Sequence, residues 1–258
     1  MKPMDDLSRP MFVETTAAIH RHFGTFEQQE FVIQAMKNRR IITCTFVLFE
    51  YKRVVQRPCV ELHRLLTRTG DINEAFRLYG QSYSVSQLSI GYSLFPPILG
   101  QATDNIREVL GRLESLIEND LSALFRLDVD EITDATHCAL AYRQPVRYGN
   151  TYASGFLSVS RAAFDCDLPN FIEANRDAFQ AVYDALTEER SQRTRRLRQT
   201  LARVLRNPAE SRGRNALILA DLVIAVEMPA EALLLTTNRR DFEKICSILG
   251  KDIFPHTD

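Results

Sequence analysis

The chain has 258 residues, of which 45% are hydrophobic and 25% are charged, and its formal net charge at neutral pH is −1. This length suits one large domain, or one domain with a substantial insertion, and the composition excludes a disordered chain. The near-neutral balance excludes a global nucleic-acid-binding charge, so any electropositive surface has to be local.

The first segments alternate between short apolar runs and helical patterns, with an acid at each transition. Residues 11–13 predict a strand, Glu14 follows it, and a helix begins with the two threonines at 15 and 16. A second helix is expected over residues 26–40, and the β-branched residues 41–43 indicate a second strand. From Thr45 another helix is expected, with Glu50 among apolar neighbours. A carboxylate there is costly unless it is paired, protonated or metal-bound.

The middle of the chain, residues 71–212, is expected to be mostly helical. Apolar residues recur at the helical period over residues 104–127 and again over residues 168–186, and both stripes are typical of packing helices. The stretch between them contains tyrosines, glycines and a proline, which favour loops.

The cysteines and the apolar runs indicate in which cellular compartment the protein is expected. Five cysteines stand at positions 44, 59, 138, 166 and 246, an odd number without the spacing of a disulfide framework. His137, Cys138 and Cys166 could supply a zinc site, but the missing C-x-x-C pair makes zinc the weaker interpretation. No segment offers the roughly 18 unbroken apolar residues that a membrane span needs, and the start lacks the apolar core of a secretion signal. We therefore expect a cytoplasmic protein without a membrane partner.

Residues 190–214 form an arginine-rich segment, with nine arginines against one acid, Glu210. Its apolar residues make a narrow stripe, so a helix here can dock while its other faces present guanidinium groups. Arginine forks match phosphate geometry, and a local cluster can attract RNA to a neutral chain. We assign RNA binding to Arg193, Arg195, Arg196 and Arg198. The alternative is a solvated helix face that pairs with Glu188, Glu189 or the acids of a protein partner.

A second isolated acid follows the arginine-rich segment. Residues 216–226 are apolar apart from Asp221, and Pro229 marks the break between this buried helix and a strand. An ionised carboxylate in such a run needs a strong partner. Asp221 is therefore either held structurally, for example by Arg212 or Arg214, or it belongs to a functional site.

The last motif is a strand, a polar loop and a helix over residues 232–249. Thr237 and Asn238 lie in the loop, and an amphipathic stretch follows Asp241. In an open α/β sheet, the loop after a strand's carboxyl end is the usual ligand site. The plain alternative is that Thr237 or Asn238 caps the helix and that Asp241 favours the positive end of its dipole.

Together, the four acids and their neighbours resemble the motifs of the PIN-domain nucleases. They stand as "VETTAAI", "VLFEYKR", "ADLVIAV" and "TTNRRDF", in the order of that family, over about residues 10–70 and 213–258. The resemblance implies a three-layer α/β fold with a central, mainly parallel sheet. Its first part would be residues 1–70 and its second part residues 213–258, separated by a large, mostly helical insertion over residues 71–212. The family's first acid is usually an aspartate, and Glu14 is longer by one methylene, about 1.5 Å.

The function implied by the resemblance is that of a metal-dependent ribonuclease, and many such proteins are the toxin half of toxin–antitoxin pairs. Its catalytic metal ligands would be Glu14, Glu50, Asp221 and Asp241, since several carboxylates share a small site in ionised form only when a cation compensates them. Hard oxygen ligands suit Mg²⁺ or Mn²⁺. Thr237 and Asn238 would orient waters or a phosphate.

The implied partners are RNA, an antitoxin or other protein, and a second copy of the chain in a homodimer. The alternative function is a non-catalytic PIN-like scaffold whose insertion binds a protein or RNA partner.

Overall fold

A five-stranded parallel sheet forms the centre of the molecule. The computed structural model describes residues 8–82, 105–120, 125–153, 157, 166–186 and 191–255. The strands are β1 (Met11–Val13), β2 (Ile41–Cys44), β3 (Glu131–Thr133), β6 (Leu233–Leu235) and β7 (Asp252–Ile253), in the order β3-β2-β1-β6-β7. Every pairing between neighbours is parallel. The α/β class and the central parallel sheet expected from the sequence are thereby confirmed.

The strand order reverses direction beside β1. The chain runs outward from β1 to β2 and β3, then returns to β6 on the other side of β1 and continues to β7. In sheets of this kind the crevice at the carboxyl ends of the strands, where the order reverses, is the usual ligand site. That crevice lies between the end of β1 and the end of β6.

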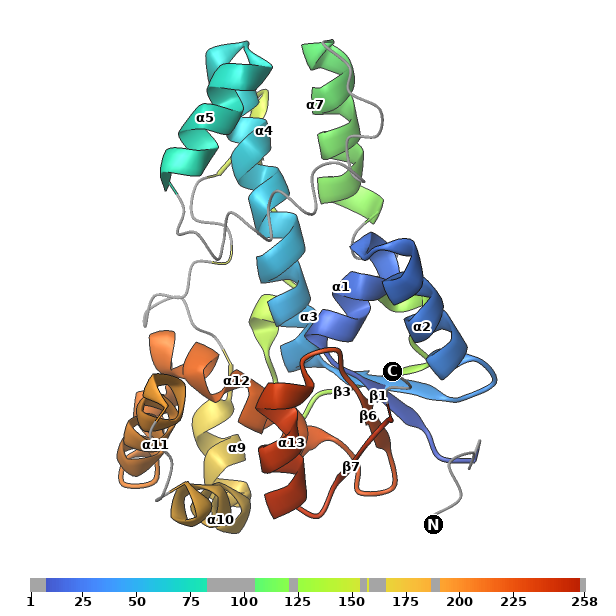
Figure 1. Ribbon diagram of the computed structural model, residues 1–258. Coiled ribbons are helices and arrows are strands. Elements are labelled where there is room, and N and C mark those ends of the chain that lie inside the picture. The colour runs from blue at the N-terminus through green and yellow to red at the C-terminus, as the bar shows by residue number, and fades with distance from the viewer. Residues whose placement is uncertain are drawn as a thin grey trace.

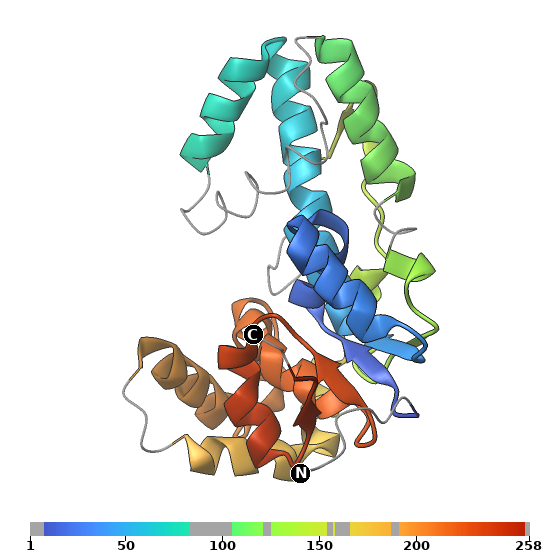
Figure 2. The same cartoon turned by 45° about the vertical axis from the view of Figure 1, so that its right-hand side comes forward.

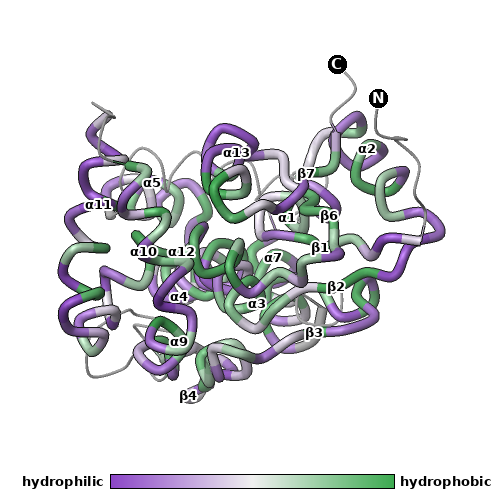
Figure 3. The backbone as a smooth tube through the Cα atoms, turned by 90° about the horizontal axis from the view of Figure 1, so that it is seen from below, coloured by the Kyte–Doolittle hydropathy of each residue, from purple (hydrophilic) through white to green (hydrophobic). Residues whose placement is uncertain are grey.

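Helices cover the sheet from two sides. Figures 1 and 2 show α1 (Thr15–Phe23) and α2 (Phe26–Met36) on one side of the strands, and α12 (Arg214–Glu227) and α13 (Arg239–Ile248) on the other. The central strands β1 and β2 are buried along their whole length and mostly apolar, as expected where a sheet is covered on both faces. Seen from below in Figure 3, the central strands and α3 are mostly hydrophobic, whereas long stretches of α11 are hydrophilic.

A long helical rod leads away from the sheet. It consists of α3 (Thr45–Tyr51), the π-helical turn η1 (Lys52–Gln56) and α4 (Arg57–Thr69). Pro58 is in the first turn of α4, but the helix continues before it, so its missing N–H and its ring disturb the preceding turn, which is the π turn η1. Gly70, with φ +63°, ends the rod in a left-handed cap. Figure 1 shows α5 (Ile72–Ser82) and α7 (Ile106–Ser115) beside its outer end.

A second group of helices packs beside α12 and α13. It contains α9 (Leu168–Ala174), α10 (Arg176–Ala185) and α11 (Gln192–Val204), with α11 against α12 and α10 against both α11 and α13. The remaining short elements are η2 (Leu116–Asp120), η3 (Ala139–Ala141), β4 (Arg147–Tyr148), β5 (Thr151–Tyr152) and η5 (Pro208–Ser211).

The structure differs from the sequence expectations in several places, and the helix expected over residues 26–40 ends at Met36. Strand β3 belongs to the central sheet although it lies within residues 71–212, so this range is not only an addition to the sheet. Residues 168–186 form two helices, because Asn175 leaves the helical conformation and its side chain donates to the carbonyl of Phe171 at 2.8 Å. Strand β7 was not anticipated. Among the described residues, no helix is both long and apolar enough to cross a bilayer.

Candidate functional site

Segments far apart in the sequence bring the four acids to one edge of the sheet. Glu14 directly follows β1, Glu50 lies on α3 directly after β2, Asp221 lies on α12, and Asp241 lies in the first turn of α13 after β6. The charges influence one another: Asp221 raises the pKa of both Glu14 and Glu50, and Asp241 raises the pKa of Asp221. The acids therefore form one electrostatically coupled cluster, which we call the acid cluster.

Glu14 is the most enclosed member of the acid cluster and also caps α1. Its side chain accepts hydrogen bonds from the backbone N–H of Thr16 at 2.7 Å and of Ala17 at 3.2 Å, and from the Thr16 hydroxyl. Burial raises the pKa of Glu14 to about 7 against the opposing effect of these donors, and repulsion from Asp221 adds to the rise. Both carboxylate oxygens are thus engaged within the protein, which is the structural use that a helix cap predicts.

The Glu50 carboxylate lies between the hydroxyl of Thr15 and the guanidinium of Arg53. Its Oε2 accepts from the Thr15 hydroxyl at 3.0 Å, and its Oε1 lies 3.9 Å from Nη2 of Arg53. Burial raises its pKa to about 7 although Arg53 acts in the opposite direction, and the charges of Asp221 and Glu14 raise it further. A carboxyl with such a pKa changes its protonation state near neutral pH, as a group that exchanges protons with a substrate should.

Arg193 of α11 joins Asp221 and Asp241. Its Nη2 donates to Oδ2 of Asp221 at 2.6 Å, and its Nη1 donates to Oδ2 of Asp241. The partner of Asp221 is therefore neither Arg212 nor Arg214, and Arg193 occupies the acid cluster instead of a free surface. The Arg193 side chain remains 64% exposed, against 28% for Asp221 and 13% for Asp241. One cation from the neighbouring helix thus offsets two acids at the open side of the cluster.

The loop after β6 connects the two halves of the acid cluster. The Thr237 hydroxyl donates to that of Thr16 at 2.9 Å, and Thr16 in turn donates to Glu14. Asn238 occupies the N-cap position of α13 without a capping hydrogen bond from its side chain. Its side-chain amide instead donates to Asp241 at 2.5 Å. Asn238 therefore contacts Asp241 directly, Thr237 is connected to Glu14 through the Thr16 hydroxyl, and the plain capping interpretation of Asn238 is wrong.

Sequence reasoning missed several polar residues of this site. Thr15 and Thr16 bind the two glutamates, Thr236 accepts from the backbone of Asn238 at 2.9 Å, and Arg53 faces Glu50. Part of this site could have been predicted from the sequence. Two threonines directly after an acid at a strand end can reach that acid, and Arg53 lies one helical turn from Glu50.

A groove between α11, α12 and α13 opens onto Asp221 and Asp241. Its cavity of about 400 Å³ is lined on the α11 side by Arg193 and Arg196 and on the α13 side by Arg240 and Lys244. Glu14 and Glu50 are not part of this lining, and Glu14 is buried. We call this feature the α11–α13 groove.

The four arginines expected to bind RNA do not share one surface. Arg193 and Arg196 line the α11–α13 groove, whereas the exposed Arg195 does not. Arg198 lies over the ring of Tyr183 in α10, 5.1 Å from its centroid, which is a packing position. Their separation follows from the helical turn, since successive residues point in different directions. Glu188 and Glu189, the other expected partners, lie outside the described residues.

The chemistry of the acid cluster fits a hard divalent cation. Four carboxylates with hydroxyl and amide neighbours are the oxygen donors that Mg²⁺ and Mn²⁺ prefer. Burial, together with the charge of Asp221, raises the pKa of Glu14 and of Glu50, and a bound cation would favour their ionised forms. In the present arrangement of side chains, no three His, Cys, Asp or Glu residues in the described part of the chain lie close enough together to hold one ion. Side-chain movement, and the departure of Arg193, would therefore accompany binding.

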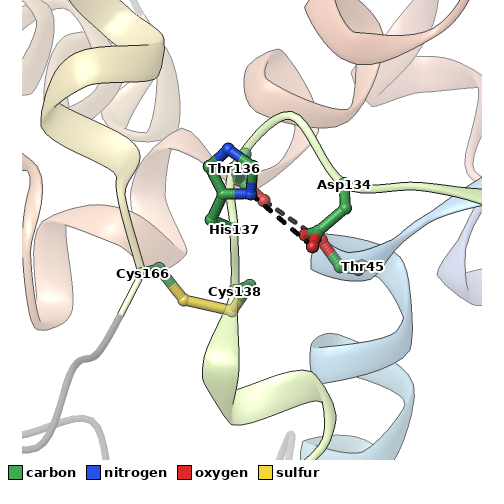
Figure 4. Close-up of a disulfide and its surroundings, with 6 residues drawn as sticks. All are labelled: Thr45, Asp134, Thr136, His137, Cys138 and Cys166. Atoms are coloured by element: carbon green, nitrogen blue, oxygen red, sulfur yellow. Dashed lines mark hydrogen bonds and ion pairs between the residues drawn. A yellow bond between two sulfur atoms is a disulfide. The ribbon is translucent and has the colours of Figure 1, made fainter.

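The two cysteines considered for zinc form a disulfide instead. Figure 4 shows Cys138 joined to Cys166, beside His137 and the pair made by Asp134 and Thr45. The Thr45 hydroxyl donates to Asp134 at 2.7 Å, which ties the start of α3 to the loop after β3. Both thiols are consumed, so the zinc interpretation fails here. The other cysteines, Cys44, Cys59 and Cys246, are free and buried.

The comparison with known proteins finds no relative of this chain. No protein family, no curated protein and no solved structure matches the chain. The assignment of the site accordingly rests on its own geometry and chemistry.

Proposed function

We propose that the chain is a PIN-like, metal-dependent ribonuclease that hydrolyses phosphodiester bonds of RNA. The observation that carries the proposal is the convergence of Glu14, Glu50, Asp221 and Asp241 from four separate segments into one coupled cluster at the point where the strand order reverses. A structural ion pair needs only one acid, whereas several carboxylates that share a small site are the usual ligands of a divalent cation that assists phosphoryl chemistry.

Each acid has a distinct part in this function. Asp221 and Asp241 face the α11–α13 groove and would hold the ion on its open side, with Glu50 and Glu14 on the inner side. A bound Mg²⁺ or Mn²⁺ supplies Lewis acidity toward a phosphate oxygen and lowers the pKa of a water. Glu50 accepts from the Thr15 hydroxyl through Oε2, whereas its Oε1 lies 3.9 Å from Nη2 of Arg53, so Oε1 is the oxygen that would turn to the ion. Thr237 and Asn238 orient the cluster through their bonds to Thr16 and Asp241.

A non-catalytic scaffold is the second candidate function, and two observations favour it. Both oxygens of Glu14 are taken by protein donors, and Arg193 already neutralises Asp221 and Asp241. In a scaffold these bonds would be permanent features of the fold. RNA or a protein would then bind without a requirement for metal.

The two functions differ in a direct experiment. Purified chain is incubated with a labelled single-stranded RNA of mixed sequence in the presence of Mn²⁺, Mg²⁺ or EDTA, beside Asp221→Asn and the matched surface variant Glu243→Gln. Glu243 lies on the exposed side of α13 and pairs with Arg239. A nuclease cleaves with metal only, loses cleavage in Asp221→Asn and keeps it in Glu243→Gln. Absence of metal-dependent cleavage in the parent, or equal cleavage in both variants, contradicts the proposal.

The proposal includes four narrower expectations from the sequence. They are the role as toxin of a toxin–antitoxin pair, an antitoxin or other protein partner, a homodimer and a cytoplasmic location. The disulfide bears on the last of these, because disulfides are uncommon in the cytosol.

A further inference from the structure

The α11–α13 groove carries positive charge on two separate walls. Arg196 lies one helical turn beyond Arg193 on α11, and Lys244 lies one turn beyond Arg240 on α13. Among the lining residues, four cationic side chains stand against two acidic ones, Asp221 and Asp241. Arg193 is bound to both acids, and the other cationic side chains of the lining are those of Arg196, Arg240 and Lys244.

We propose that the α11–α13 groove binds the phosphate backbone of a single-stranded RNA, with Arg196 on one wall and Arg240 and Lys244 on the other as its phosphate contacts. The inference rests on the proposed function in placing the scissile phosphate at Asp221 and Asp241. It adds the path of the strand and the residues that hold it. Arg240 and Lys244 stand outside the arginine-rich segment and carry no role in the sequence interpretation.

The positions of these residues suit a polymer better than a small anion. From Arg240 to Lys244 the wall extends by four residues of helix, about 6 Å along the axis, and the spacing from Arg193 to Arg196 is similar. The two walls therefore continue away from the acid cluster in successive steps, as contacts to consecutive phosphates require. Arg240 and Arg196 are exposed, so their guanidinium groups can form paired hydrogen bonds with phosphate oxygens.

The lining of the groove favours an unpaired strand over a duplex. Between the cationic walls lie aliphatic side chains, of which Leu197 and Leu217 are partly exposed, whereas Leu222 and Ile245 are buried. Proteins that bind single strands combine a cationic groove with planar groups on which unstacked bases lie, and Arg guanidinium groups such as those of the exposed Arg196 and Arg240 serve this purpose as well as aromatic rings. Bases in a duplex are stacked on one another and cannot reach such a surface, and duplex RNA is recognised mainly through its outer shape.

The test separates backbone binding from catalysis by omitting metal. Binding of a fluorescent single-stranded RNA is measured in EDTA over a series of salt concentrations for the parent and for Arg240→Gln/Lys244→Gln. The control is Arg212→Gln/Arg214→Gln, which removes the same charge from exposed residues near the start of α12, outside the groove lining. Circular dichroism confirms that all three proteins are folded. The groove variant should bind more weakly, and the slope of log K against log salt should shrink by about 1.4, about 0.7 for each lost phosphate contact.

The outcomes distinguish this inference from the proposed function. Selective loss in the groove variant, together with weaker binding of the annealed duplex by the parent, supports the groove even if Mn²⁺ elicits no cleavage, in which case only the nuclease function fails. Equal slopes for the groove variant and the control overturn the groove assignment. Binding of poly-glutamate, but not of RNA, by the parent also overturns it and identifies the groove as a site for an acidic protein segment.

Discussion

The substitution Asp221→Asn distinguishes a ligand from a structural ion-pair member. The Arg193 partner of Asp221 is 64% exposed, so water reaches the pair, and an exposed ion pair contributes only about 0.2–1 kcal/mol to stability. Burial and the charge of Asp241 act against this contribution, because both raise the pKa of Asp221 and make its ionised form unfavourable. We therefore expect the free energy of unfolding to change by no more than about 1 kcal/mol in either direction, with the ion pair and the relieved repulsion offsetting each other.

The same substitution should remove metal binding and cleavage. Asparagine keeps the shape of aspartate but loses the charge that a hard cation requires. Calorimetric titration with Mn²⁺ should show at least a tenfold loss of affinity, which corresponds to about 1.4 kcal/mol. Urea unfolding in EDTA reports stability without the metal, and the transition midpoint in a thermal scan should shift by no more than about 4 °C.

The refuting result is a large loss of stability. If Asp221 belongs to a buried structural pair, Asp221→Asn should cost about 3–5 kcal/mol, because an uncompensated charge is left behind. That loss, with Mn²⁺ affinity unchanged, would show that the acid cluster is structural. Glu243→Gln, which removes an acid from the exposed side of α13, should behave as the parent in both measurements.

Three further predictions concern protons, the resident arginine and the disulfide. Because the pKa of Glu50 rises from 4.5 to about 7 on folding, its effect on stability is most favourable below about pH 4.5 and is lost as the pH rises to about 7, each pKa unit being worth about 1.4 kcal/mol. Chemical unfolding across that range should show Glu50→Gln gaining stability relative to the parent as the pH rises, and a constant difference would contradict the assigned pKa. Arg193→Gln should bind Mn²⁺ several-fold more tightly than the parent by calorimetry, because the competing cation is gone, whereas Arg196→Gln should not; equal affinities in both variants would mean that Arg193 does not obstruct the site. Peptide mapping without reduction should recover Cys138 joined to Cys166, and reduction should lower the free energy of unfolding by about 3–4 kcal/mol for a loop of 28 residues. Recovery of both thiols free and alkylated would contradict the linkage.

Local pattern was sufficient for much of the fold. The short apolar run before Glu14 became β1, the β-branched residues at 41–43 became β2, and the apolar helix around Asp221 became α12. These elements are specified by the length and period of their own apolar residues, which no distant contact has to correct. Two acids at the carboxyl ends of predicted parallel strands also have to lie near one edge, so part of the acid cluster followed from the order of the elements.

Other elements depended on contacts that local pattern does not contain. Strand β3 has three half-buried residues, and β7 has two, so neither carries a recognisable period and each is defined by the strand beside it. The break at Asn175 is similar, because it relies on one hydrogen bond within a stretch whose apolar spacing continues. Single edge strands and helix breaks of this size have too few residues to specify themselves.

The sequence by itself determined that isolated acids follow strand ends and that one helix carries an excess of arginine. Tertiary structure decided how these charges are combined. Arg214 lies seven residues before Asp221 on the same helix, about 10 Å along its axis, and cannot form a close pair with it in that geometry. Arg193 reaches Asp221 because α11 packs against α12. It also reaches Asp241 because α13, which follows β6, packs against α12 as well. The choice of partner for a buried charge is made by such packing, since electrostatic attraction acts between positions in space and not between positions in the chain.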